Sequence, residues 1–253
     1  MYYGYNISDY TAALAVQAEE DCREQFKKIE ENALRCSAKV LSAFQECRVS
    51  TADFIEITGY GYSDDGRDKL EEIYARVFGA EDALVRPQLM SGTHALAVTL
   101  GGLLKHGDTL LYVSGKPYDT LQSVIGTVGD SRNSLIKNGV KYEEIDLIDN
   151  DFDIEAIKNR LGESFVKVAA IQRSRGYSAR KSLTIDKLER VIREIKAVSP
   201  ETVIMVDNCY GEFTCENEPE ADLLVGWEGG VCIPRAWIHC WKSVHADWAL
   251  WHC

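Results

Sequence analysis

Two groups of residues in this chain have the types and the spacing to bind a phosphorylated ligand that also carries a nitrogen. The first is the turn 91–94 (Ser-Gly-Thr-His), between an apolar strand-like segment at 83–85 and a helix-like segment at 95–104. A glycine-containing turn that opens a helix presents free backbone N–H groups and the positive end of the helix dipole, which bind phosphate. The second is Asp207, which follows the strand-like segment 202–206. Together they predict a cofactor with a phosphate at one end and a basic nitrogen at the other.

Both features also have ordinary structural explanations. Ser-Gly-Thr turns serve as helix caps, and an aspartate after a strand is common as a turn cap. A further alternative is an α/β enzyme that binds a different phosphorylated substrate at 91–94. The choice between these interpretations depends on the other motifs of the chain.

The composition argues against several classes of partner. The 253 residues are 45% hydrophobic, and 40 acidic against 28 basic residues give a net charge of −12. We therefore expect no nucleic-acid partner. No apolar run approaches the ~20 residues that cross a membrane, and the first residues lack a signal-peptide pattern. The cysteines are scattered and form no metal-ligand spacing, so we expect a cytoplasmic, reduced protein with no metal site.

The first 48 residues predict a helical arm. Residues 11–48 are consistent with one long amphipathic helix, because apolar residues recur at three- and four-residue spacing on one face: Phe26, Ile29, Ala33, Cys36, Val40 and Phe44. Such a face ordinarily packs within its own chain. The alternative is that the arm packs on a partner subunit.

From about residue 67 the pattern alternates between helix and strand. Helices are expected at 67–78, 95–104, 119–127, 153–161 and 184–198, and strands at 83–85, 109–113, 140–145, 166–171 and 202–206. This alternation predicts an α/β fold with a mainly parallel sheet and flanking helices. Ligands bind at the carboxyl ends of such strands, so the turns to examine are 91–94, 114–118, 172–177 and 207–210. No Gly-x-Gly-x-x-Gly or Walker motif is present, which disfavours a dinucleotide site.

Five motifs in order carry a family resemblance. They are the segments 59–67 (GYGYSDDGR), 86–95 (RPQLMSGTHA), 114–121 (SGKPYDTL), 172–178 (QRSRGYS) and 206–213 (VDNCYGEF). From about residue 10 to 226 the chain resembles the methionine gamma-lyase family, also called the aluminium resistance protein family. This resemblance implies the large domain of a fold-type-I enzyme that depends on pyridoxal 5'-phosphate (PLP).

The resemblance also implies a role for individual residues. Cofactor binding is implied for Ser91, Gly92 and Thr93 at the phosphate, Tyr118 stacked on the pyridine ring, and Asp207 paired with the ring nitrogen; Tyr60, Tyr62 and Arg67 would reach the phosphate of a neighbouring subunit. A protonated ring nitrogen matters because it makes the ring an acceptor for electrons from the substrate. His94 either touches the ring or has no ligand role. Arg173, Arg175 or Arg180 would bind the substrate carboxylate, and the sequence does not choose among them.

The family's lysine that joins the cofactor as a Schiff base is not found at its expected place. The segment 222–226 fits the strand before it, but the next residues are Trp-Glu-Gly-Gly. All five tryptophans and three of the five histidines lie in 227–253. The segment 237–242 is compatible with codons that give Gly-Tyr-Ile-Ala-Gly, as in the family, when they are read one base later. We therefore expect a helical arm (1–48), a partial PLP-binding large domain (49–226) that is incomplete at its C-terminus, and an out-of-frame tail (227–253), without the small C-terminal domain.

The expected function follows from this assignment. At the family level it is PLP-dependent carbon–sulfur cleavage of a sulfur amino acid, by a protein that forms homo-oligomers. This chain is expected to be inactive, and no catalytic residue is identified, because the lysine is missing. The alternative is a non-catalytic PLP-fold fragment or pseudo-enzyme.

Overall fold

The structure, a computed structural model, describes residues 6–57, 64–226 and 230–233. Its centre is a seven-stranded sheet in the order β1-β7-β6-β5-β4-β2-β3. The strands are β1 Asp82–Val85, β2 Thr109–Tyr112, β3 Lys141–Glu144, β4 Val168–Gln172, β5 Val203–Asp207, β6 Leu223–Val225 and β7 Gly230–Ile233. Only β7 runs antiparallel to its neighbours within this sheet. The mainly parallel α/β sheet expected from the sequence is confirmed.

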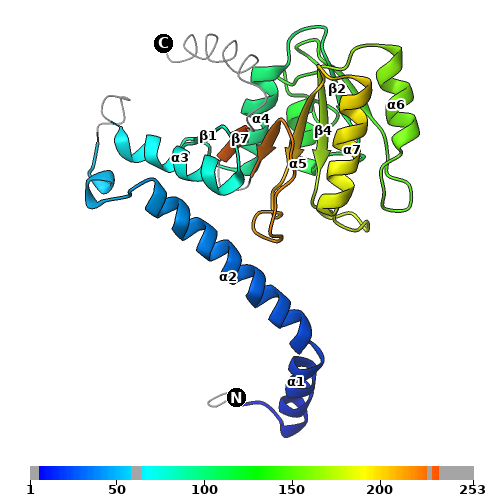
Figure 1. The fold of residues 1–253 in the computed structure, drawn as a ribbon. Coiled ribbons are helices and arrows are strands. Elements are labelled where there is room, and N and C mark those ends of the chain that lie inside the picture. Colours follow the sequence, from blue (N-terminus) through cyan, green and yellow to red (C-terminus); the bar gives the residue numbers. More distant parts are fainter. Residues whose placement is uncertain (1–5, 58–63, 227–229, 234–253) are drawn as a thin grey trace.

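Helices cover both faces of the sheet (Figure 1), so the central strands β2, β4, β5 and β6 are buried on two sides. One face packs against α4 (Gly92–Leu103) and α5 (Asp119–Ile125). The other packs against α6 (Ile154–Glu163) and α7 (Ile185–Val198), with α3 (Asp65–Phe78) near the β1 end. None of the described helices is both long and apolar enough to span a membrane.

Alternation along the central strands decides which side chains face α4. In β5, Val203 and Met205 belong to the core beneath α4, whereas Ile204 and Val206 belong to the core beneath α7. Since successive side chains of a strand point to opposite faces, Asp207 extends to the α4 face. The same alternation in β4 places Gln172 on that face with Val168 and Ala170. Two polar side chains therefore end the apolar surface beneath α4.

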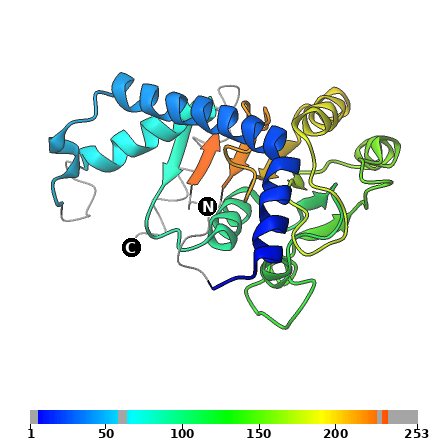
Figure 2. The same ribbon diagram turned by 90° about the horizontal axis from the view of Figure 1, so that it is seen from below.

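The arm consists of two helices where the sequence predicted one. Helix α1 spans Asp9–Asp21 and α2 spans Arg23–Glu46, and the chain bends at Cys22, whose φ and ψ are −94° and 0°. Figures 1 and 2 show α1 at an angle to α2. The physical reason is that no residue of α1 is buried, so no packing holds α1 in line with α2.

Helix α2 packs on the body from Asn32 onwards. The side-chain amide of Asn32 donates to the carbonyl of Phe213 at 2.8 Å, and Cys36 and Ala43 are buried. Phe26 and Ile29 are 50% and 62% exposed, because the first turns of α2 project away from the sheet (Figure 1). Packing within the chain therefore accounts for only part of the predicted apolar face.

Two short elements were not expected from the sequence. A 3₁₀ helix, η1, spans Thr51–Phe54 and begins at a capping box formed by Ser50 and Asp53. Strand β7 lies beyond the boundary expected at residue 226 and pairs with both β1 and β6. The described sheet thus extends into the segment that the sequence assigned to the tail.

Candidate active site

The N-terminus of α4 is built as the sequence predicted for an anion site. Ser91 is the N-cap, with extended backbone, and its Oγ accepts from the N–H of His94 at 3.2 Å. The Nδ1 atom of His94 accepts from the N–H of Met90 at 3.3 Å, so this ring is turned back onto the turn before the helix. Helix α4 has 12 residues, which is long enough for its dipole to favour an anion at this end.

A hydroxyl pair joins this turn to the start of α5. The Oγ1 atoms of Thr93 and Thr120 are 2.6 Å apart. Tyr118 is the N-cap residue of α5, two positions before Thr120. The turn predicted for phosphate and the residue predicted for ring stacking therefore lie side by side at the carboxyl edge of the sheet.

Tyr118 is fixed through both its backbone and its ring. Its N–H donates to Oε1 of Gln172 at 2.6 Å, and its ring lies 5.6 Å from the ring of Tyr177, at an interplanar angle of 32°. Hydrogen bonding to Tyr177 raises the pKa of Tyr118 to about 12. Tyr118 is thus a neutral phenol near pH 7, held at the start of α5.

Asp207 ends β5 as a buried carboxyl group. It is 4% exposed, and its Oδ1 accepts from the N–H of Cys209 at 3.1 Å. Burial, together with the charge of Glu212, raises the pKa of Asp207 from 3.8 to about 6. In the sheet register Asp207 is the partner of Gln172, so the acid is one strand away from the residue that holds Tyr118.

These residues fit the group that the resemblance implies. The helix N-terminus supplies N–H donors for a phosphate, and Tyr118 supplies an aromatic face. A buried carboxylate whose ionised form is disfavoured by desolvation is stabilised by a cationic partner, as a protonated ring nitrogen would be. All three lie along the carboxyl edge, and Asp207 and α4 share one face of the sheet.

The structure separates the three candidate arginines, beginning with Arg173. Its guanidinium is buried and holds the loop that follows β5, where Glu218 is its ionic partner at 3.2 Å. It also donates to Oδ1 of Asn208 at 2.7 Å and to the carbonyl of Gly211 at 3.0 Å. These bonds direct Arg173 to the interior of the loop, and no pattern in the sequence indicates this arrangement.

Arg175 and Arg180 lie at the cavities that open beside Tyr118. Two adjoining cavities share Tyr118, Arg175 and Tyr177 in their walls; Arg180 also lines the first of them and Arg173 the second. Arg175 is exposed. Arg180 donates to the carbonyl of Gln172 at 2.8 Å, and burial lowers its pKa below the usual range. Of the three arginines, Arg175 is the most accessible to a bound molecule.

The residues predicted to reach a neighbouring subunit are only partly described. Tyr60 and Tyr62 lie outside the described residues. Arg67 lies in the first turn of α3, where its Nε is 3.2 Å from Oδ2 of the buried Asp64. The roles of all three stay predictions.

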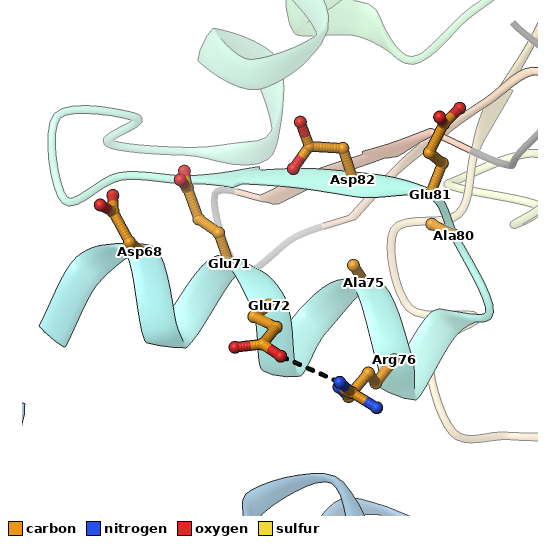
Figure 3. A pocket seen from close by; sticks show the side chains of 8 residues that line it. All are labelled: Asp68, Glu71, Glu72, Ala75, Arg76, Ala80, Glu81 and Asp82. Carbon is orange, nitrogen blue, oxygen red and sulfur yellow. Dashed lines mark hydrogen bonds and ion pairs between the residues drawn. The ribbon is translucent and has the colours of Figure 1, made fainter. Parts of the chain in front are cut away.

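A third cavity lies away from this edge, between α3 and β1 (Figure 3). It is lined mainly by acidic side chains, which are Asp68, Glu71, Glu72, Glu81 and Asp82. Internal bonds occupy two of them, because Glu72 pairs with Arg76 at 2.9 Å and Oε1 of Glu71 accepts from the N–H of Val85 at 2.8 Å. In the described part of the chain, no three or more His, Cys, Asp or Glu side chains are placed so that they could hold a metal ion.

Sequence reasoning missed two residues of the site. Gln172 ends the same alternation that buries Val168 and Ala170, and a polar residue at the end of that series was the available signal. Tyr112 is fully buried on the α4 face, and its hydroxyl has no hydrogen-bond partner among the described residues.

Comparison with known proteins assigns this arrangement to a family. The sequence profile described as methionine gamma-lyase matches residues 11–228. The chain belongs to the methionine gamma-lyase family. Over 217 residues it is 43% identical to the uncharacterised protein YnbB of Bacillus subtilis, a match that covers 84% of this chain and 51% of YnbB.

Solved structures agree with this family and define the fold. A carbon–sulfur lyase involved in aluminium resistance from Clostridium novyi NT is 42% identical with a TM-score of 0.83, covering 87% of this chain and 53% of the lyase. The PLP-dependent protein YhfS of Escherichia coli is 20% identical with a TM-score of 0.61, and the match covers 87% of this chain and 58% of YhfS. At this identity the likeness shows the fold alone. The fold is that of the fold-type-I PLP enzymes. This member of the methionine gamma-lyase family spans about half the length of the relatives it matches.

Proposed function

We propose that this chain forms the cofactor-binding part of a PLP-dependent carbon–sulfur lyase that acts on a sulfur amino acid. The observation that carries the proposal is the placement of buried Asp207 on the α4 face, at the edge where α4 begins. One bound molecule with an anionic end and a cationic ring nitrogen would satisfy both. The family assignment supports the same conclusion.

Each residue has a distinct task in this proposal. The cofactor, when bound, supplies an electron-accepting ring for breaking bonds at the substrate's α-carbon. Ser91, Gly92 and Thr93 hold the phosphate at the helix N-terminus, and Tyr118 covers the ring. Asp207 holds a proton on the ring nitrogen, which lowers the free energy of its own charged form. We assign the substrate carboxylate to Arg175, since bidentate binding of a carboxylate suits an exposed guanidinium at the cavity mouth.

We also propose that the chain by itself binds cofactor without turnover. In the family, the lysine that forms the Schiff base follows the strand that corresponds to β6. The sequence after β6, from Gly226 to Ile233, contains no lysine. A lysine in that place would also move protons during the reaction. The non-catalytic PLP-fold module therefore remains the second candidate function, and the same binding site supports it.

A second copy of this chain is the proposed partner of the arm. Phe26, Ile29, Leu34 and Leu41 are exposed on α2, and burying such side chains is the usual driving force for subunit association. We expect Phe26→Glu with Ile29→Glu to reduce the molecular mass measured by light scattering to that of a monomer.

We place the protein in the cytoplasm; the five described cysteines are free thiols, as expected in a reducing compartment.

Titration with pyridoxamine 5'-phosphate tests the cofactor site. This amine forms no imine with a protein, so its calorimetric dissociation constant reports the phosphate, ring and nitrogen contacts alone. We expect binding to the wild-type chain and at least ~10-fold weaker binding to Asp207→Asn, the value of one charge-assisted contact. Asp186→Asn removes an exposed charge at the start of α7, outside the cavities beside Tyr118, and serves as the matched control. Absence of binding to the wild-type chain would refute the proposal.

A further inference from the structure

A single buried side chain, on the strand next to the one that carries the acid, holds the residue expected over the cofactor ring. Gln172 is 4% exposed. Its Oε1 accepts from the N–H of Tyr118 at 2.6 Å, and its Nε2 donates to the carbonyl of Ser174 at 3.1 Å. Its sheet partner is Asp207. The geometry points to Gln172 as a positioning residue that sets Tyr118 at a fixed place relative to Asp207.

The backbone of Gln172 is fixed as firmly as its side chain. Its N–H donates to Oγ of Ser114 at 2.9 Å, and its carbonyl accepts from Arg180 at 2.8 Å. With every polar group engaged, the side-chain amide has one orientation, in which Oε1 faces the start of α5. The N–H of Tyr118 precedes the hydrogen-bonding pattern of α5, so it needs an acceptor from outside the helix.

Gly176 leaves room for the ring of Tyr118. Its φ is +56°, which favours glycine, and a Cβ there would lie 3.2 Å from Cδ2 of Tyr118 and 3.3 Å from Nε2 of Gln172. The ring of Tyr118 therefore packs directly on the backbone at residue 176. Tyr177 also packs against the ring, with the two centroids 5.6 Å apart. The loop 173–177 is thus shaped around Tyr118.

The inference depends on the proposed function only where it calls Tyr118 a cofactor residue. Hydrogen exchange at the amide of Tyr118 tests, without any cofactor, whether Gln172 holds Tyr118. We expect Gln172→Leu to speed this exchange about tenfold, since a buried hydrogen bond is worth roughly that factor. Gln172→Glu keeps the Oε1 acceptor but loses the Nε2 donor to Ser174, so its Tyr118 amide should exchange more slowly than that of Gln172→Leu and faster than that of the wild type. Ser114→Ala, which removes a hydrogen bond from the same strand end without touching Tyr118, is the matched control.

The affinity for pyridoxamine 5'-phosphate then tests whether the placement of Tyr118 matters for ligand binding. We expect Gln172→Leu to bind about tenfold more weakly than the wild type, which corresponds to the loss of one contact. Ser114→Ala should bind with nearly wild-type affinity. Gly176→Ala should also weaken binding, because its Cβ would press on both the ring of Tyr118 and Nε2 of Gln172. If Gln172→Leu does not fold, Gln172→Met, which keeps the length of the side chain and removes its two polar atoms, takes its place in both measurements.

Two results would overturn the inference. One is an exchange rate at the Tyr118 amide that is the same in Gln172→Leu as in the wild type. The other is an equal rise in the exchange rates of interior amides such as that of Ala169, which would show a general loss of stability. If the wild-type chain does not bind the amine, the cofactor proposal fails, and amide exchange still decides whether Gln172 holds Tyr118.

Discussion

Gln172 and Asp207 are paired residues at the ends of β4 and β5, and both side chains lie on the face that α4 covers. Gln172 carries the hydrogen bond to Tyr118, and Asp207 is the buried acid. The aromatic and acidic components of the proposed site are therefore fixed by one pair of adjacent strands. Parallel strands rigidly packed on both faces are well suited to hold such groups at constant separation.

The pKa of Asp207 predicts a pH-dependent contribution to stability. Because burial raises this pKa from 3.8 to about 6, the folded state binds the proton more tightly than the unfolded state does. The favourable contribution is complete below pH 3.8 and is lost as the pH rises through about 6. Relative to wild type, Asp207→Asn should therefore gain on the order of 2 kcal/mol between pH 4 and pH 7. Urea unfolding at a series of pH values measures this, and parallel curves for the two proteins would contradict it.

Removing Arg173 should destabilise the loop after β5. The side chains of Arg173 and Glu218 are both 6% exposed, and truncation of one leaves the other charge buried without its partner. We expect Arg173→Met to lower the free energy of unfolding by about 3 kcal/mol, and Arg173→Met with Glu218→Leu to recover part of that loss. Arg175→Met, at an exposed position, should change stability by less than about 0.5 kcal/mol. Equal effects at both arginines would show that Arg173 is not a structural residue.

The cap at Ser91 should contribute measurably to stability. Its Oγ accepts from the N–H of His94, so Ser91→Ala leaves that donor without an acceptor. We expect a loss of about 1 kcal/mol, whereas Ser91→Asn, which can cap equally well, should be close to neutral. Thermal and urea unfolding of the two variants provide the comparison. If the asparagine variant lost as much as the alanine variant, the cap would not be the cause.

Carbon–sulfur cleavage should be absent from the isolated chain. With no lysine from Gly226 to Ile233, added PLP should bind without supporting release of a thiol from cystathionine or methionine. A thiol reagent measures the product, and the Clostridium novyi lyase serves as the positive control. Sustained thiol release by the purified 253-residue chain would contradict the proposal.

The α/β class, the order of helices and strands between about residues 67 and 226, and the turns at the carboxyl ends were predictable from the sequence. They depend on local periodicity: β-branched runs such as 202–206 are buried on both sides, and the apolar stripe of 184–198 faces the sheet. The family was predictable as well, because five motifs occur in order along the chain. These features require no knowledge of which distant residues touch.

The links between the motifs were decided only by the tertiary structure. Arg173, Arg175 and Arg180 are equivalent in the sequence, yet the loop after β5 folds around Arg173 alone. The bond from Tyr118 to Gln172 joins residues 54 positions apart, and the bend at Cys22 reflects missing packing around α1. Each depends on which surfaces meet when the chain folds, and the spacing of residues along one helix or strand does not contain that information.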